Sequence, residues 1–239
     1  MPRDVSALPT EPVTIDVDGT HRVSALLQLP SPARACFILA HGAGAGMEHP
    51  FMISVASELG ARGVATLRYQ FPYMERRAGR PDPPPLCHAT VRAAVSEAAR
   101  RAPALPLIAG GKSFGGRMTS QAQAIAPLAG VRGLAFLGFP LHPAGRPSDA
   151  RAKHLFEVGI PMLFLQGTAD KLAELELLRP LLDALGEHAA LKLLQDADHS
   201  FHVPARTGRK DADVRSEMWD ALVVWIDSLL GRSQSQATR

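Results

Sequence analysis

Cysteine is scarce in this sequence, which has only Cys36 and Cys87 among its 239 residues. Two thiols are too few for the disulfide framework that stabilises small secreted domains. Cys36 stands in an apolar run, so we expect it to be a small buried hydrophobic side chain. The cysteine count therefore excludes the class of disulfide-stabilised scaffolds.

Long apolar runs are also missing, since no stretch of 18 apolar residues occurs. The first twelve residues, MPRDVSALPTEP, lack the apolar core of a secretory signal peptide. We therefore expect a cytoplasmic protein that does not associate with membranes. No internal repeat or long low-complexity tract is present either.

Neither basic clusters nor metal-binding patterns stand out. The net charge is only +3, and the arginines are scattered as solvated helix faces and loops would be. No group of histidine, cysteine and carboxylate residues has metal-ligand spacing. We therefore expect no nucleic-acid partner, no metal and no cofactor, and a monomer or a small homo-oligomer.

Apolar strand-like runs alternate with helical segments along the chain. The expected strands are two within 14–30, around an Asp-Gly turn, and one each in 33–42, 64–70, 105–111, 133–140, 161–167 and 190–198. The expected helices are 50–63, 86–102, 117–128, 173–186 and 212–231. The prolines in 71–85 predict an irregular loop there.

This alternation predicts an α/β fold, a mostly parallel central sheet flanked by helices on both faces. We expect a single domain over 1–239, with an ordered core of about 12–231 and flexible ends at 1–10 and 233–239. No insertion is long enough for a large cap domain, and 140–155 is the one candidate for a small lid. In such sheets the ligand site lies at the carboxyl ends of the strands.

Ser113 lies among four glycines in the stretch GGKSFGG, residues 110–116. Residues 111–115 fit the G-x-S-x-G pattern, in which a nucleophilic serine occupies a strained turn between a strand and a helix. The glycines provide the clearance that such a turn needs. A loose polar turn is the alternative, and the pentapeptide alone does not decide between the two.

A serine nucleophile needs a histidine base and an orienting carboxylate, expected in the order Ser, Asp, His. Asp170 follows the apolar run at 161–167, and His199 follows the one at 190–198. Asp170 could instead cap a helix, and His202 competes with His199. Asp196 and Asp198 are better explained as turn residues. The order, and the position of each residue after a strand, favour Ser113, Asp170 and His199 as the catalytic residues.

The stretch HGAGAGM, residues 41–47, follows another strand and consists mainly of small residues. We expect the backbone N–H groups of Ala43 and Phe114 to form an oxyanion hole. A dinucleotide-binding loop is disfavoured, because the spacing is not G-x-G-x-x-G and no acidic residue ends the next strand.

Two loops that follow strands are expected to line the substrate pocket. The expected lining residues are Tyr69, Phe71, Tyr73, Phe139, Leu141 and His142. Arg68, Arg76, Arg77 or His142 could bind an anionic group. The alternative is that these aromatic residues pack into the core.

Six stretches taken together resemble those of the α/β hydrolases, and more narrowly the dienelactone-hydrolase-like small bacterial hydrolases related to a human testis-expressed protein. They are HGAGAGM, LRYQFPYMERR, GGKSFGGRM, LGFPLHPAG, LFLQGTADKL and DADHSFHVP. The resemblance implies Ser113 as nucleophile, Asp170 as acid and His199 as base, with Ala43 and Phe114 as oxyanion donors. The stretch TADKLAE departs from the family pattern, because it lacks a glycine shortly after the aspartate.

These observations predict a serine hydrolase that cleaves a small carboxylic ester or a thioester through an acyl-enzyme intermediate. One alternative is a binding or scaffold protein that keeps the fold without turnover. Another is a triad used for perhydrolysis or cyanohydrin cleavage.

Overall fold

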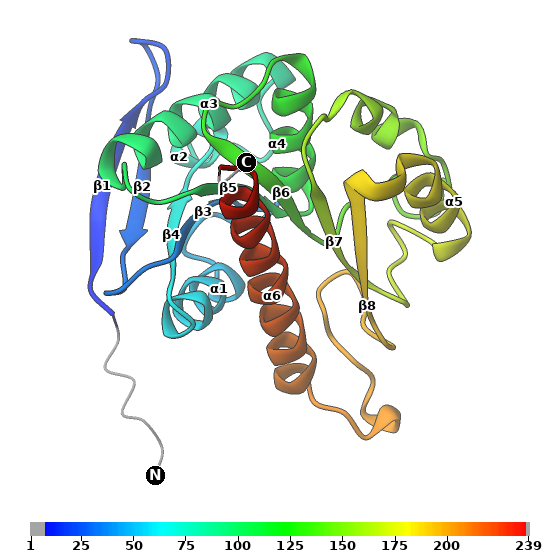
Figure 1. Ribbon diagram of the computed structural model, residues 1–239. Helices are drawn as coiled ribbons and strands as arrows, with labels where there is room; N and C mark the ends of the chain where they lie inside the picture. Colours follow the sequence, from blue (N-terminus) through cyan, green and yellow to red (C-terminus); the bar gives the residue numbers. More distant parts are fainter. Residues whose placement is uncertain (1–7, 238–239) are drawn as a thin grey trace.

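A computed structural model of the chain describes residues 8–237. Its centre is an eight-stranded sheet in the order β1-β2-β4-β3-β5-β6-β7-β8 (Figure 1). β1 pairs with β2, and β2 with β4, in antiparallel fashion, while all pairs from β4 to β8 are parallel. The predicted fold class, a mostly parallel sheet with helices on both faces, is therefore confirmed.

The strands agree with the apolar runs of the sequence. They are β1 (Thr10–Asp16), β2 (Arg22–Gln28), β3 (Ala35–Ala40), β4 (Val64–Tyr69), β5 (Leu107–Lys112), β6 (Val131–Leu137), β7 (Met162–Gly167) and β8 (Ala189–Leu194). Every residue of β3, β4 and β7 is buried, which explains why these runs are mainly apolar and do not alternate with exposed polar residues.

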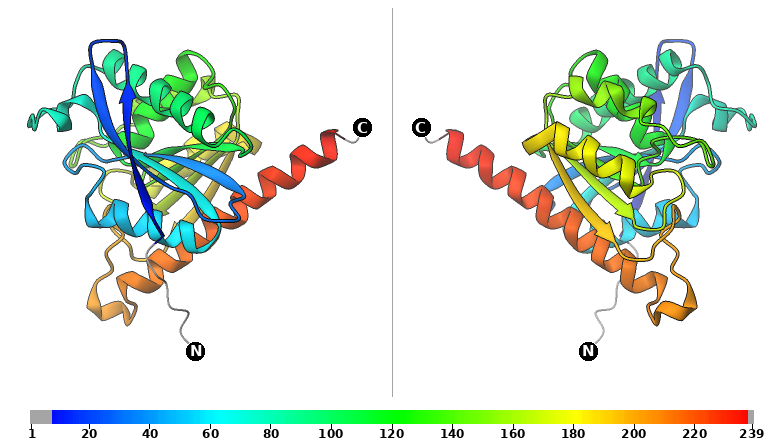
Figure 2. Two further views of the ribbon diagram at one scale, coloured as in Figure 1. Left: turned by 90° about the vertical axis from the view of Figure 1, so that its left-hand side faces the viewer. Right: turned by 90° about the vertical axis from the view of Figure 1, so that its right-hand side faces the viewer.

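The helices pack on both faces of this sheet. They are α1 (Pro50–Ala61), α2 (Pro72–Glu75), α3 (Pro84–Arg101), α4 (Phe114–Ile125), α5 (Leu175–Leu185) and α6 (Asp211–Ala237). Buried side chains of α3, α4 and α5 form one core cluster, and those of α1 and α6 form another. Figure 2 shows α1 and α6 on one side of the sheet, and α3 and α4 on the other.

Two segments add detail to the sequence-based expectations. The loop 71–85 contains the short helix α2, because Pro72 occupies its first turn, where a missing N–H costs nothing. The candidate lid at 140–155 ends in a 3₁₀ helix, Ala150–Glu157 (η1). η1 contacts α4, where Ser120 Oγ lies 2.8 Å from His154 Nε2. Within residues 8–237 no cap domain is inserted.

The limits of the ordered region also differ from the expected 12–231. β1 begins at Thr10, and α6 continues to Ala237, five residues into the expected flexible tail of 233–239. The rest of the two expected flexible ends, 1–7 and 238–239, lies outside the described residues. One domain over 1–239 stays a prediction.

No helix between residues 8 and 237 is both long and apolar enough to span a membrane. The cytoplasmic location and the oligomeric state stay predictions.

The aromatic side chains under β6 and β7 should dominate the stability of this core. Phe136 is fully buried, with its ring centroid 4.8 Å from that of Phe164 and 5.1 Å from that of Phe139. We expect Phe136→Ala to lower the free energy of unfolding by about 3–5 kcal/mol, because it leaves a cavity in a close-packed layer.

Urea unfolding followed by circular dichroism measures this loss. The matched control is Val224→Ala, because Val224 is 68% exposed on α6; it should change the free energy by less than about 0.5 kcal/mol. Equal effects of the two substitutions would contradict the assignment of Phe136 to the core.

Candidate active site

Ser113 occupies the turn between β5 and α4 in a strained backbone conformation. Its φ is 51° and its ψ is −114°, which side-chain-bearing residues rarely adopt. The strained turn predicted from G-x-S-x-G is therefore confirmed, and the loose polar turn is excluded.

The neighbouring glycines allow backbone to approach backbone around this turn. A Cβ on Gly115 would lie 2.5 Å from the carbonyl oxygen of His41, at the end of β3. A Cβ on Gly110 would lie 1.9 Å from the carbonyl oxygen of Ala135 in β6. Gly110 is therefore needed for β5 to fit beside β6.

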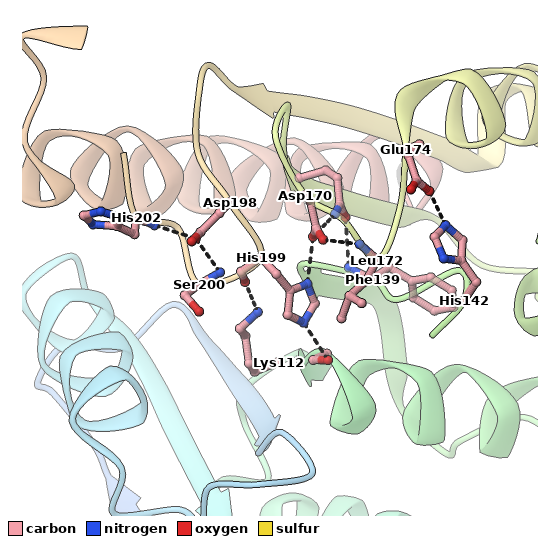
Figure 3. A network of polar contacts seen from close by, with 12 residues as sticks. Lys112, Phe139, His142, Asp170, Leu172, Glu174, Asp198, His199, Ser200 and His202 are labelled. Atoms are coloured by element: carbon pink, nitrogen blue, oxygen red, sulfur yellow. Dashed lines mark hydrogen bonds and ion pairs between the residues drawn. The ribbon is translucent and has the colours of Figure 1, made fainter. Parts of the chain in front are cut away.

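The structure brings the hydroxyl of Ser113, the imidazole of His199 and the carboxylate of Asp170 into one hydrogen-bonded chain. His199 Nε2 lies 2.8 Å from Ser113 Oγ, and His199 Nδ1 lies 2.7 Å from Asp170 Oδ2 (Figure 3). Because a carboxylate accepts from Nδ1–H, Nε2 is free to accept the serine proton. This is the arrangement that converts a serine hydroxyl into a nucleophile.

Asp170 is 3% exposed, and three donors fix its carboxylate. Besides His199, Gln166 Nε2 donates to Oδ2 at 2.5 Å and the Leu172 N–H donates to Oδ1 at 2.8 Å. The Gln166 carbonyl accepts from the Phe139 N–H at 2.9 Å, which fixes the amide in turn. The sequence analysis missed Gln166, although an amide at the end of the apolar strand MLFLQG was a usable signal.

His199 lies in a loop that is held by hydrogen bonds with Asp198 and Lys112. Asp198 Oδ1 accepts the N–H groups of Ser200 and His202, so Asp198 is a turn residue. His202, the competing histidine, lies beyond Asp198 and apart from His199 (Figure 3), and its Nδ1 lies 3.0 Å from Asp211 Oδ2.

Lys112 holds the same loop from the side of β5. Its ammonium donates to the carbonyl oxygen of His199 at 2.5 Å and lies 4.9 Å from the ring centroid of Phe201. Burial lowers the pKa of Lys112 to about 8, with Asp170 and Asp198 opposing that shift. Lys112 therefore ties the strand that leads to Ser113 to the loop that carries His199.

The loop after β3 brings Ala43 to the wall of the cavities that Ser113 also lines. His41 Nδ1 donates to the Gly42 carbonyl at 2.7 Å, while its Nε2 accepts from the Phe71 N–H at 3.0 Å. Burial lowers the pKa of His41 to about 4, so the ring is neutral, as this pairing requires. The Tyr73 hydroxyl donates to the Ala43 carbonyl at 2.9 Å. Three side-chain and backbone contacts thus orient the peptide of Ala43.

The N–H groups of Ala43 and Phe114 have no protein acceptor within the described residues. Phe114 is the first residue of α4, where an N–H has no partner inside the helix. Both residues line a cavity together with Ser113. They are therefore available to a ligand oxygen at this position.

The expectation that six side chains line the pocket is corrected by their burial. They are at most 1% exposed, and none contributes to either cavity at Ser113: Tyr69, Phe71, Tyr73, Phe139, Leu141 and His142. The physical reason is the large apolar area of these side chains, which is worth more in the core than in an open pocket.

The polar groups in these two loops are used for support rather than for binding. His142 Nε2 contacts the Glu174 carboxylate (Figure 3), and Arg68 donates to the carbonyl of Met47 at 3.0 Å. Arg76 pairs with Asp82, and Arg77 occupies a turn with φ of 54°.

Two cavities of about 400 Å³ each flank Ser113. The first, here the apolar cavity, is lined by Phe51, Met52, Leu172, Lys112, Ser113 and His199. The second, here the arginine cavity, is lined by Ser113, Phe114, Met118, Pro140, Arg117 and Arg151. Both volumes are in the range typical of small-molecule sites.

A mostly parallel sheet with a strained serine turn after a central strand is the architecture of the α/β hydrolases. Residues 33–227 match a family model described as an alpha/beta hydrolase domain. The chain therefore belongs to the α/β hydrolase family. The narrower likeness to a human testis-expressed protein stays a prediction.

Solved structures with similar folds include several hydrolases of bacteria. A dienelactone hydrolase from Anabaena variabilis has 24% identity and a TM-score of 0.70, covering 89% of this chain and 97% of that one. An α/β serine hydrolase homologue from Coxiella burnetii has 18% identity and a TM-score of 0.71, with coverage of 89% and 97%. A serine hydrolase without lid from Xanthomonas campestris has 22% identity and a TM-score of 0.68, with coverage of 90% and 94%. At these identities the likeness establishes the fold.

The buried ammonium of Lys112 should make stability depend on pH. Its pKa is about 8 in the folded protein against 10.5 for an ordinary lysine, so in this window the unfolded chain binds a proton that the folded chain lacks. The contribution of Lys112 to the free energy of unfolding therefore rises with pH, by at most about 1.4 kcal/mol per pH unit.

Lys112→Met removes this titration, so wild-type protein should gain stability relative to the variant as the pH rises from 8 to 10.5. Urea unfolding of both proteins across this window measures the difference, in which the titration of the shared cysteines and tyrosines cancels. A difference that stays constant with pH would contradict the assignment.

Proposed function

We propose that this protein is a serine hydrolase that cleaves a carboxylic ester or a thioester through an acyl-enzyme intermediate. The observation that carries the proposal is the hydrogen-bonded chain from Ser113 through His199 to the buried Asp170. Membership of the α/β hydrolase family supports it, and a small-molecule ester would reach Ser113 through the two flanking cavities.

In the first step Ser113 Oγ attacks the carbonyl carbon of the ester, and its proton passes to His199 Nε2. The carbonyl oxygen becomes an oxyanion that accepts hydrogen bonds from the N–H groups of Ala43 and Phe114. These donors are fixed before the substrate arrives, so they need no reorganisation during the reaction. Asp170 stabilises the imidazolium that forms and keeps Nδ1 protonated.

In the second step the bond to the leaving group breaks, and His199 gives its proton to the departing alcohol or thiol. Ser113 is then acylated. A water molecule, deprotonated by His199, attacks the acyl carbon, the carboxylic acid leaves, and the proton returns to Ser113 Oγ.

Replacement of Ser113 by alanine should abolish both activity and covalent labelling. We expect Ser113→Ala to lower kcat for short p-nitrophenyl esters by on the order of 10⁶-fold, because no other group forms the acyl-enzyme. A fluorophosphonate probe should label wild-type protein at Ser113 and leave the variant unlabelled, as read by mass spectrometry. Folded wild-type protein that resists the probe would overturn the proposal and favour a binding or scaffold role.

The carboxylate of Asp170 should matter far more than that of its neighbours. Asp170→Asn keeps the shape but loses the charge that stabilises the imidazolium and selects the tautomer, so kcat should fall by about 10⁴-fold. The matched control is Asp196→Asn, because Asp196 has φ of 59°, which asparagine also adopts, and it lies outside the chain to Ser113. Equal losses in the two variants, measured by steady-state kinetics, would contradict the role of Asp170.

A further inference from the structure

Two guanidinium groups lie beside Ser113, in the arginine cavity. Arg117 is in the first turn of α4 and Arg151 is in η1, and both line the cavity together with Ser113. The guanidinium carbon of Arg117 lies 5.7 Å from the ring centroid of Phe114. The oxyanion donors and this pair of cations thus face one space.

The positive charge of this pair is not balanced by the protein. Within residues 8–237 neither Arg117 nor Arg151 takes part in an ion pair, and the buried Nε of Arg117 has no hydrogen-bond partner. The one carboxylate that lines the cavity, that of Asp82, pairs with Arg76. Burial and the charge of Arg151 both lower the pKa of Arg117. An anion in the cavity would relieve both penalties.

The proton transfer from His199 in the proposed reaction assigns each cavity to one half of the ester. The leaving group must receive its proton from His199, and His199 lines the apolar cavity but not the arginine cavity. The alcohol therefore departs on the apolar side, between Phe51 and Met52. The acyl chain is left to occupy the arginine cavity, next to Phe114 and Met118.

We propose that the arginine cavity binds a carboxylate at the far end of the acyl chain, so that the substrates are half-esters of dicarboxylic acids with an uncharged alcohol. Guanidinium groups suit this ligand because their planar N–H donors match the two oxygens of a carboxylate. The hydrocarbon segment between the two carboxyl groups packs against Met118 and Pro140. This inference rests on the proposed ester hydrolysis, whose acyl side it specifies.

Matched pairs of ethyl esters test the subsite. The monoethyl esters of succinic, glutaric and adipic acids are compared with ethyl butyrate, pentanoate and hexanoate, which have the same number of acyl carbons but end in a methyl group. At the best chain length, wild-type protein should show a ratio of kcat/KM between charged and neutral ester of on the order of 10- to 100-fold.

Arg117→Gln and Arg151→Gln should each lower this ratio about tenfold or more, because each removes one charge-assisted contact. The ratio is measured within one protein preparation, so partial misfolding of a variant cancels. Arg151→Gln changes a partly exposed side chain of η1, so it tests the subsite even if Arg117→Gln prevents folding. The control is Arg146→Gln, because Arg146 is an exposed arginine in the loop before η1 and does not line the cavity. The ratio of this variant should equal that of wild-type protein.

The possible results separate this inference from the proposed function. Hydrolysis of charged and neutral esters at equal rates overturns the carboxylate subsite and leaves the ester hydrolase standing. If no ester is hydrolysed and no fluorophosphonate label appears, the proposed function fails. In that case a binding measurement tests the carboxylate subsite by itself. Calorimetry should detect binding of monoethyl adipate to the Ser113→Ala variant, and no binding to the double variant that also carries Arg117→Gln. No binding to Ser113→Ala protein overturns the subsite.

Discussion

The close approach of backbone to backbone around β5 is the constraint on which the site depends. β5 lies between β3 and β6, and glycines at 110, 111 and 115 leave no side chain where neighbouring carbonyl oxygens stand. This packing holds Ser113 at a positive φ, a conformation that costs about 1–3 kcal/mol and that an isolated chain would leave. The sheet therefore fixes the backbone from which the hydroxyl of Ser113 projects.

Most of the side chains around Ser113 serve to orient others. Gln166 and the Leu172 N–H hold Asp170, Lys112 holds the loop of His199, and Tyr73 holds the peptide of Ala43. These supports lie at or after the ends of three strands, β4, β5 and β7, so the parallel sheet brings distant parts of the sequence to one edge. Hydrogen bonds from these neighbours thus fix Asp170 and the loops of His199 and Ala43, as a pre-organised site requires.

The sequence predicted most of the fold, because the central parallel strands are mainly apolar runs, an Asp-Gly turn marks β1 and β2, and the strand-to-helix order is regular. It also placed Ser113, Asp170 and His199 after strand ends, because that rule is topological. It failed for the pocket wall, where Phe71 and Phe139 are buried. Whether an aromatic side chain after a strand points to solvent or to the core depends on tertiary packing, which spacing does not encode. Gln166 and Arg117 escaped notice for the same reason, since their roles arise only from neighbours distant in sequence.

The positions of Ser113 and Arg117 on one helix have a consequence for selectivity. The N–H of Arg117 donates to the carbonyl of Ser113 at 3.1 Å, so the two residues are separated by a single helical turn, a rise of about 6 Å. A ligand that contacts both residues must span this distance, which the movement of a loop does not change. Under the proposed carboxylate subsite, the first turn of α4 would set the distance between the ester carbonyl at Ser113 and the far carboxylate at Arg117.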